Sequence, residues 1–305
     1  MWKKEARTIL EPRTVREYSQ IIEDRFLSTL KDKKLVEIKP YQIKEIVLAA
    51  EPRKKGVKTL SRKTKKRFLN ALSSVFNVAK DQYRIIDRNP VSDVRLPKDQ
   101  ANQSKTPAPY SIEEVKTMLA ALEEHASDKT RVLVLTAFFT GAREGEIAAL
   151  EEKDIDYKNR TIHFHQRITM NEKKKYVRRD GLKASDSKVV PVPDSYLLIL
   201  KDFISINKKA RKKLRVSPRH KYVFGSPDGQ FELPTSLYRN WTRFVEQAGL
   251  RKIRFHDLRH TSASYLLAEA KIPVKVVQEL LGHKDYRTTV NIYGHALEET
   301  KRTAS

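Results

Sequence analysis

The chain has 305 residues, with 62 lysines and arginines against 38 aspartates and glutamates, so that its net charge is +24. This charge predicts a polyanionic partner, with nucleic acid as the first expectation and an anionic membrane surface as the second. There is no cysteine, which excludes disulfides, thiolate zinc sites and cysteine nucleophiles. No apolar run is long enough to span a bilayer, and we expect a soluble intracellular protein.

Residues 1–98 carry roughly half of the net charge, and their apolar periodicity predicts helices over 13–30, 40–50 and 61–84. The last of these helices has an apolar face made of Phe68, Leu72, Val75, Phe76, Ala79 and Tyr83. Its first turns hold a cluster of cations: Arg62, Lys63, Lys65, Lys66 and Arg67. The helix dipole disfavours cations at that end, so we expect them to bind DNA phosphates, with a solvated basic face as the alternative.

A proline-rich stretch over 99–110 predicts an interdomain linker. Ser111 and Glu114 then form the S-x-x-E pattern of a capping box, which opens a second domain over 111–305. Here the pattern predicts a buried helix over 131–140, a short helix over 144–150, and further helices from 195 onwards. Strands are predicted over 161–164 and 189–192, joined by a charged hairpin around Asp180 and Gly181. The predicted fold class is mostly α with a small β-sheet (α+β).

Several short segments place cations or imidazoles at helix edges. The segment TGAREGEIAAL puts Arg143 just after a glycine, where its planar guanidinium suits an oxyanion. The segment FHDLRHTSASYLL places His256, Arg259 and His260 on one helical face. His283 follows Gly282 in LGHKD. Taken alone, Lys183 in GLKASDSKVVPV is interpreted as a solvated turn residue. Tyr293 in TTVNIYGHALEET, taken alone, is interpreted as a residue that packs in a core.

The HDLRH segment has the spacing of the HExxH zinc motif, with Asp257 in place of glutamate. Arg259 projects from the same face and would repel a metal ion. We therefore expect an anion rather than zinc at this face, and no metal in the site.

Taken in order, these segments resemble the tyrosine recombinase or phage integrase family, that is, lambda-integrase-like site-specific recombinases. The matching segments are TGAREGEI, GLKASDSKVVPV, HDLRHT, LGH and TTVNIYGH. The segments LEPRTVREYSQII and NPVSDV are similar to the helical core-binding domain of that family. The resemblance implies a core-binding, DNA-binding domain over 1–98 and a catalytic domain over 111–305. Two expectations follow for the N-terminal side: either the protein is a simple two-domain recombinase, or an arm-binding domain precedes this chain in the full protein, and we favour the second.

The resemblance implies a role for each matched residue. Tyr293 is expected to attack the scissile phosphate and form a 3′-phosphotyrosyl bond, while Arg143 and Arg259 clamp its nonbridging oxygens. Lys183 is expected to be the general acid, His256 to assist proton transfer or hold the nucleophile, and His283 to donate a hydrogen bond to a nonbridging oxygen. Glu146 is expected to orient the site, and His260 to be a packed structural residue. Lys188 stands where many relatives have arginine, and we expect this substitution to have a mild effect.

The function implied is metal- and ATP-independent integration or excision of a phage or mobile element, with no cofactor. The expected partners are double-stranded DNA with specific attachment or core sites, three further copies in a homotetramer on synapsed DNA, and accessory DNA-bending or directionality proteins. Off DNA we expect a monomer, in the cytoplasm at the nucleoid of a prokaryote, with no membrane partner. Two alternatives remain: relaxation of DNA in the manner of a type IB topoisomerase, and a DNA-binding regulator that does not cleave.

Overall fold

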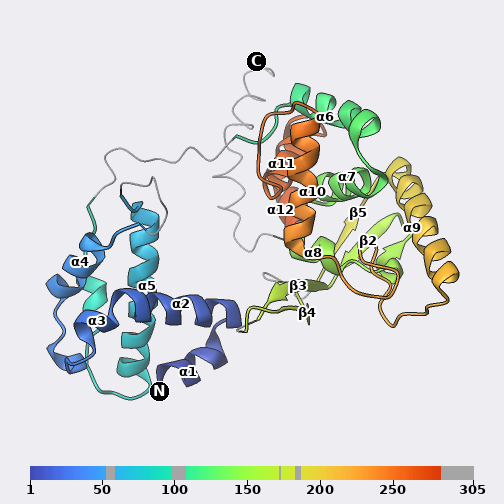
Figure 1. The fold of residues 1–305 in the computed structure, drawn as a ribbon. Coiled ribbons are helices and arrows are strands. Elements are labelled where there is room, and N and C mark those ends of the chain that lie inside the picture. Colours follow the sequence, from blue (N-terminus) through green and yellow to red (C-terminus); the bar gives the residue numbers. More distant parts are fainter. Residues whose placement is uncertain (53–58, 98–107, 172, 183–186, 283–305) are drawn as a thin grey trace. The chain divides into compact units, whose positions relative to one another are not determined.

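The computed structural model describes residues 1–52, 59–97, 108–171, 173–182 and 187–282. Its elements are mainly helices, with small antiparallel sheets (Figure 1), which confirms the predicted fold class. The chain divides into two compact units: an N-terminal unit of residues 1–105 with 170–175, and a C-terminal unit of residues 106–169 with 176–305. No helix in the described part is both long enough and apolar enough to cross a membrane.

The N-terminal unit is helical, and its described part over residues 1–97 contains no strand. Its elements are α1 (Trp2–Ile9), α2 (Pro12–Arg25), α3 (Leu27–Leu30), η1 (Leu35–Glu37), α4 (Pro40–Ala49), α5 (Arg62–Asp81) and η2 (Pro90–Asp93). The helix predicted over 13–30 is interrupted at Phe26, whose side chain is fully buried. Phe26 packs with residues of α4 and α5, among them Ile43, Val47 and Phe76. The core of this unit therefore forms where these helices meet.

Helix α5 follows the predicted amphipathic pattern. Ser61 caps it, because its Oγ accepts a hydrogen bond from the backbone N–H of Thr64 at 3.2 Å. Phe68, Leu72 and Phe76 are buried along one face. The predicted end at residue 84 is wrong, since the helix ends at Asp81. Arg84 has a φ of +49°, a left-handed backbone conformation that cannot continue a right-handed helix.

The cations at the start of α5 are mostly on the surface. Arg62, Lys63, Lys66 and Arg67 are exposed, and Lys65 is partly buried. Arg67 forms an ion pair with Glu17 of α2. Burial alone would raise the pKa of Glu17, but Arg13 and Arg67 together hold it below 4.5. Part of the charge of Arg67 is thus already balanced within the protein.

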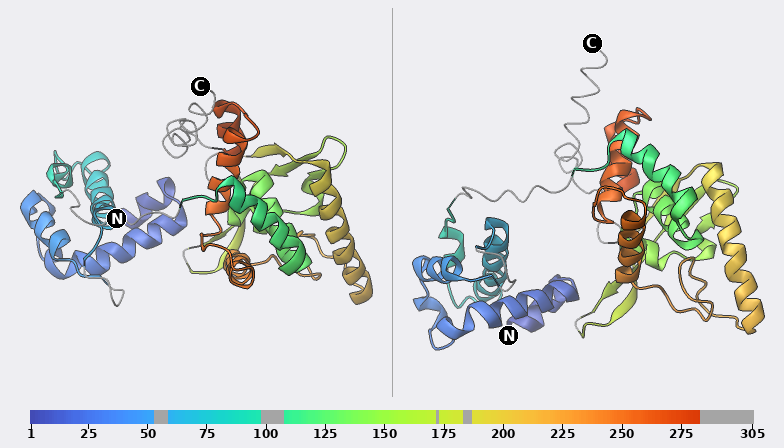
Figure 2. Two further views of the ribbon diagram at one scale, coloured as in Figure 1. Left: turned by 90° about the horizontal axis from the view of Figure 1, so that it is seen from above. Right: turned by 45° about the horizontal axis from the view of Figure 1, so that its top comes forward.

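The C-terminal unit is built around a buried helix. Its helices are α6 (Ile112–His125), α7 (Asp128–Thr140), α8 (Glu144–Ala149), η3 (Glu152–Asp154), α9 (Asp194–Leu214), α10 (Pro234–Gln247), α11 (Asp257–Ala268) and α12 (Val274–Leu281). The capping box predicted at the start of α6 is confirmed by hydrogen bonds in both directions between Ser111 and Glu114. Figures 1 and 2 show α7 in the interior of this unit, with α9 along its outer edge. The prediction of a buried helix over 131–140 is confirmed.

Two small sheets lie beside these helices. Strands β1 (Ile155–Asp156), β2 (Thr161–Phe164) and β5 (Lys188–Pro191) form an antiparallel sheet in the order β1-β2-β5. Strands β3 (Gln166–Met170) and β4 (Tyr176–Asp180) form a separate pair. The predicted position of the hairpin between β2 and β5, around Asp180 and Gly181, is therefore wrong. These strands do pair, but β3 and β4 are inserted between them, and Asp180 and Gly181 lie at the end of β4.

Two glycines fix the segment between α7 and β3. Gly141 ends α7 with a φ of +55°, and a Cβ there would lie 2.4 Å from Leu281 Cδ2. Gly145 in α8 has a right-handed conformation, but a Cβ there would lie 2.5 Å from the carbonyl oxygen of Ile168 in β3. Gly145 thus allows a close backbone approach that a larger residue would block, whereas at position 141 the left-handed φ is what favours glycine.

We predict that Gly145→Ala destabilises the C-terminal unit by about 1–3 kcal/mol, because the new methyl group overpacks against Ile168. This sign is opposite to the gain of about 1 kcal/mol that alanine normally gives in a helix. The measurement is urea unfolding followed by the fluorescence of buried Trp241, in a Trp2→Phe background that removes the other tryptophan.

The comparison variant is Gly249→Ala, where a Cβ meets nothing within 4 Å, so that any loss of stability there reports only the unfavourable φ of +61°. A Gly145→Ala protein as stable as the parent would show that α8 and β3 can separate at no cost.

Candidate active site

Among the predicted site residues that the structure describes, Arg259 is the most deeply buried cation. It lies in the first turn of α11 and is 2% exposed. Its Nη1 donates a hydrogen bond to the carbonyl oxygen of Gly141, and its Nη2 donates to that of Leu281, each at 2.5 Å. These carbonyls stand at the C-terminal ends of α7 and α12, where the last backbone acceptors have no partner within the helix. The negative ends of two helix dipoles therefore meet one guanidinium.

Arg143 is held by the helix that it precedes. Its backbone N–H donates to Glu146 Oε2 at 3.1 Å, and its Nη1 donates to Glu146 Oε1 at 2.9 Å. The carboxylate therefore satisfies one N–H at the start of α8 and also fixes the side chain of Arg143. About a quarter of the Arg143 side chain is exposed, whereas Glu146 is buried. The guanidinium thus lies at the surface of the site on a buried anionic support.

Lys188 is a further cation in this cluster. It faces inward from β5, its side chain is 5% exposed, and its Nζ lies 3.2 Å from Glu146 Oε2. The Nζ also lies 5.0 Å from the centroid of the Phe164 ring. Burial lowers the pKa of Lys188 to about 8, Glu146 opposes this change, and Arg259 and Arg143 add to it. Burial would raise the pKa of Glu146, but Lys188 and Arg143 hold it below 4.5.

His256 is the N-cap residue of α11, and part of its ring is exposed. The ring of His260 packs edge to face against it, with centroids 5.5 Å apart. Burial of the remainder of the ring lowers the pKa of His256 below 6.5, and nearby His260, Arg259 and Arg143 lower it further. Near pH 7 the imidazole is neutral, so that it can accept a proton.

Asp257 has a structural role that the zinc comparison did not suggest. It is buried, and its carboxylate accepts hydrogen bonds from the backbone N–H of Arg254 at 2.9 Å and from the Arg254 side chain. It therefore ties the segment before α11 to the first turn of that helix. Within the described ranges, no group of three or more histidine, aspartate or glutamate side chains is arranged to hold a metal ion.

The structure brings together four of the predicted residues: Arg143, Glu146, His256 and Arg259. Lys183, His283 and Tyr293 lie outside the described residues. Two of these are close in sequence to described anchors, since Leu281 precedes His283 by two positions and Leu182 directly precedes Lys183. The described part of the cluster carries a net positive charge, which suits an oxyanion with more than one negatively charged oxygen.

The burial of Lys188 was not predicted from the sequence. The only available signal was the alternation of β5, in which Lys188 and buried Val190 share one face. The carbonyl of Leu281 was also not predicted as a hydrogen-bond partner of Arg259, because a backbone atom leaves no trace in a residue pattern.

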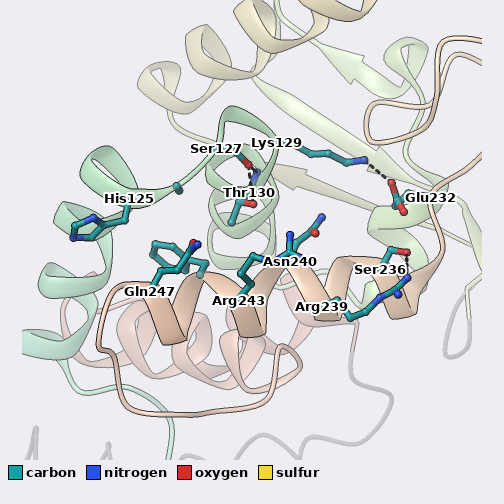
Figure 3. Close-up of a pocket in the computed structure, with 12 residues that line it drawn as sticks. His125, Ser127, Lys129, Thr130, Glu232, Ser236, Arg239, Asn240, Arg243 and Gln247 are labelled. Atoms are coloured by element: carbon teal, nitrogen blue, oxygen red, sulfur yellow. Dashed lines mark hydrogen bonds and ion pairs between the residues drawn. The ribbon is translucent and has the colours of Figure 1, made fainter.

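A cavity of about 620 Å³ lies elsewhere in the C-terminal unit, between α10 and the turn that joins α6 to α7 (Figure 3). Lys129 and Glu232 form an ion pair at one end, and His125 and Gln247 lie at the other. None of the predicted site residues that the structure describes lines it. The cation cluster and this cavity are therefore separate features.

Comparison with known proteins gives matches to two family models. Residues 111–300 match the phage integrase family, and residues 1–48 match the phage integrase N-terminal SAM-like domain. The first match covers more than half of the chain.

Individual relatives agree with these matches. A tyrosine recombinase XerC-like protein of Caldanaerobacter subterraneus subsp. tengcongensis is 28% identical over 299 residues, which are 92% of this chain and 75% of that protein. The integrase of Staphylococcus phage L54a is 30% identical over 183 residues, 57% of this chain and 51% of that protein. The Tn1549 transposon integrase in complex with transposon right end DNA aligns with a TM-score of 0.76 at 21% identity, covering 100% of this chain and 98% of that one. This last likeness establishes the fold.

We predict that the His256 ring is neutral throughout the range from pH 8 to pH 6.5, because its pKa is lowered. As the pH falls below 6.5, His256 becomes protonated in the unfolded chain but stays neutral in the folded chain. The contribution of His256 to stability is therefore complete above pH 6.5 and is lost as the pH falls through the lowered value.

The measurement is an NMR titration of ¹⁵N-histidine-labelled protein, with His256→Gln to assign the signal. A His256 midpoint at or above pH 6.5 would contradict the prediction.

Proposed function

The chain belongs to the phage integrase family and is a tyrosine recombinase, an enzyme that breaks and rejoins DNA strands, and we propose that Tyr293 is its nucleophile. The observation that best supports this proposal is that hydrogen bonds fix both arginines in place. Arg259 donates to the carbonyls of Gly141 and Leu281, and Arg143 donates to Glu146. Such a pair can clamp a phosphodiester without rearranging when charge develops on it.

The proposed cleavage step is a substitution at phosphorus. The Tyr293 oxygen forms a bond to phosphorus while the bond from phosphorus to the 5′-oxygen breaks, which leaves a 3′-phosphotyrosyl link. Neutral His256 accepts the phenol proton, or holds the nucleophile, and Lys183 gives a proton to the departing 5′-oxygen. Arg143, Arg259 and His283 bind the nonbridging oxygens. A 5′-hydroxyl from another strand reverses these steps, so that rejoining needs no ATP.

Recombination is the function that the relatives support, since they are named integrases and recombinases. We propose integration or excision of a mobile element at specific sites in double-stranded DNA. Exchange between two duplexes requires four nucleophiles, so the proposed assembly on synapsed DNA is a homotetramer, with a monomer off DNA. The proposed location is the bacterial cytoplasm at the nucleoid, with accessory DNA-bending or directionality proteins as further partners.

We propose that residues 1–98 bind DNA as a core-binding domain, joined by a linker over 99–110 to the catalytic domain over 111–305. The basic start of α5 supports this division, because Arg62, Lys63 and Lys66 are exposed at a helix end that disfavours cations. Phosphate would relieve this unfavourable placement. We propose a smaller contribution from Arg67, because Glu17 already forms an ion pair with it.

We predict that the protein forms a covalent adduct with a nicked suicide substrate, whose short cleaved fragment diffuses away. Tyr293→Phe should give no adduct, because the nucleophilic oxygen is absent. Arg143→Ala should slow adduct formation by about 100- to 1000-fold, as removal of one preorganised donor commonly does. The measurement is a denaturing gel of radiolabelled DNA at several times, with and without EDTA; the chelator should leave the rate unchanged.

The control is Arg160→Ala, which removes an exposed arginine paired with Asp194 outside the cluster and should leave the rate unchanged. An adduct formed by the Tyr293→Phe protein would assign the nucleophile to another residue.

We predict that affinity for a core-site duplex falls on the order of a thousandfold or more between 50 and 200 mM salt. Replacing Lys63 and Lys66 by alanine should lower the slope of log Kd against log salt by about 0.9 for each lost phosphate contact. The measurement is fluorescence anisotropy of labelled DNA.

Lys116→Ala is the matched control, because Lys116 is an exposed lysine of α6 that already pairs with Glu113. Equal slopes for the Lys63→Ala/Lys66→Ala protein and the parent would remove the start of α5 from the interface.

A further inference from the structure

Lys188 is enclosed on several sides within the C-terminal unit. It pairs with Phe164 in the register of β2 and β5, and its Nζ stands over the Phe164 ring. A Cβ placed on Gly282, just after α12, would lie 3.9 Å from Lys188 Cδ. Lysine is rarely buried unless its charge is paired. The partner that accounts for its position is Glu146, at 3.2 Å.

Glu146 is shared between two cations. Its Oε1 accepts a hydrogen bond from Arg143 Nη1, and its Oε2 faces Lys188 Nζ. With Lys188 protonated, this trio carries a net charge of +1. With Lys188 neutral, Glu146 and Arg143 would cancel, and a phosphate approaching Arg143 would meet a neutral ion pair. At short range inside a protein, such a difference changes the binding of an anion substantially.

We propose that Lys188 is a positioning residue whose ammonium neutralises Glu146, so that Glu146 can orient Arg143 without cancelling its charge toward the scissile phosphate. This inference rests on the proposed cleavage function. It assigns Lys188 no contact with the phosphate, so its effect on the reaction passes through Glu146 and Arg143. Arginine at this position would supply the same charge, whereas an apolar residue of similar length would not.

If the charge of Lys188 acts in this way, the rate of DNA cleavage depends on pH through the titration of Lys188. Burial lowers the pKa of Lys188 to about 8, and the charged groups that act on it most are Glu146 from α8, Arg259 from α11 and Arg143 before α8. Lys188 is therefore charged below about pH 8 and neutral above it. The rate of attack at subsaturating enzyme concentration reports the free enzyme, and it should fall as the pH rises through this value.

Lys183 could produce a similar fall, because a general acid must be protonated to act. A substrate with sulfur in place of the bridging 5′-oxygen separates the two lysines, since a thiolate leaves without receiving a proton. With this substrate the role of Lys183 is bypassed, and the remaining loss of rate at alkaline pH belongs to groups that act on phosphate binding.

The experiment measures the second-order rate of covalent adduct formation on the sulfur substrate from pH 6.5 to 9.5, for the parent and for Lys188→Arg. The ratio of the two rates cancels the titration of groups that the proteins share, including Tyr293 and His256. We expect the ratio of parent to variant to change little below pH 7 and to fall at least fivefold by pH 9.5, because arginine keeps its charge. A constant ratio over the whole range would overturn the proposal.

A second measurement separates charge from packing. At pH 7, Lys188→Met should slow adduct formation by about 10- to 100-fold, as loss of a supporting partner commonly does. In the Glu146→Gln/Lys188→Met protein the uncompensated carboxylate is gone, while an amide oxygen still accepts from Arg143. This double variant should be at least fivefold faster than Lys188→Met. A double variant equal to or slower than Lys188→Met would mean that Lys188 only fills space.

Thermal unfolding of each variant checks that it is folded, and the Lys188→Arg profile tests the proposal even where Lys188→Met does not fold. The proposed function fails separately: if the parent forms no Tyr293 adduct on either substrate, the nucleophile assignment is wrong. If the parent forms the adduct but the rate ratio is independent of pH, only the role of Lys188 is wrong.

Discussion

The hydrogen bonds from Arg259 to the carbonyls of Gly141 and Leu281 are the interaction on which the site depends. Removing an unpaired guanidinium from water costs several kcal/mol, and the carbonyls at two helix ends offset this cost. The same bonds tie α7, α11 and α12 together at one point. Arg143 follows Gly141 by two residues, so the anchor of one arginine also fixes the start of the segment that carries the other.

The backbone around this anchor is as constrained as the side chain. Position 141 has a left-handed φ that residues other than glycine rarely adopt, and a larger residue at position 145 would collide with the carbonyl of Ile168. Arg143 lies between these two constrained positions. A guanidinium is planar and has five N–H groups. The two carbonyls accept hydrogen bonds from some of these groups in Arg259, and they thereby fix the plane of the whole guanidinium. The two arginines are thus placed by the fold before any anion binds.

The sequence was sufficient for features that are local. The capping box at Ser111, the glycine that ends α7 and the grouping of His256 with Arg259 all follow from short-range spacing, and the described residues bear them out. Features set by tertiary contacts were not accessible. The insertion of β3 and β4 depends on strand pairing, and the end of α5 depends on the left-handed conformation of Arg84. The assignments of Lys183, His283 and Tyr293 rest on motif order alone.

The burial of Lys188 shows why the place of a residue in the sequence does not determine its protonation behaviour. Lys188 is the one buried lysine in the described part of this highly charged chain, because β5 turns it inward toward Glu146, where water cannot stabilise its charge. Its carboxylate partner must also support Arg143, and one anion between two cations leaves a single net charge. A clamp for a phosphodiester needs that excess, because an arginine fully balanced by its own support would have little charge left for the substrate. Glu146 orients Arg143 but also reduces its net positive charge. The buried ammonium of Lys188 offsets the charge of Glu146, so that Arg143 is oriented and its charge remains available to the substrate.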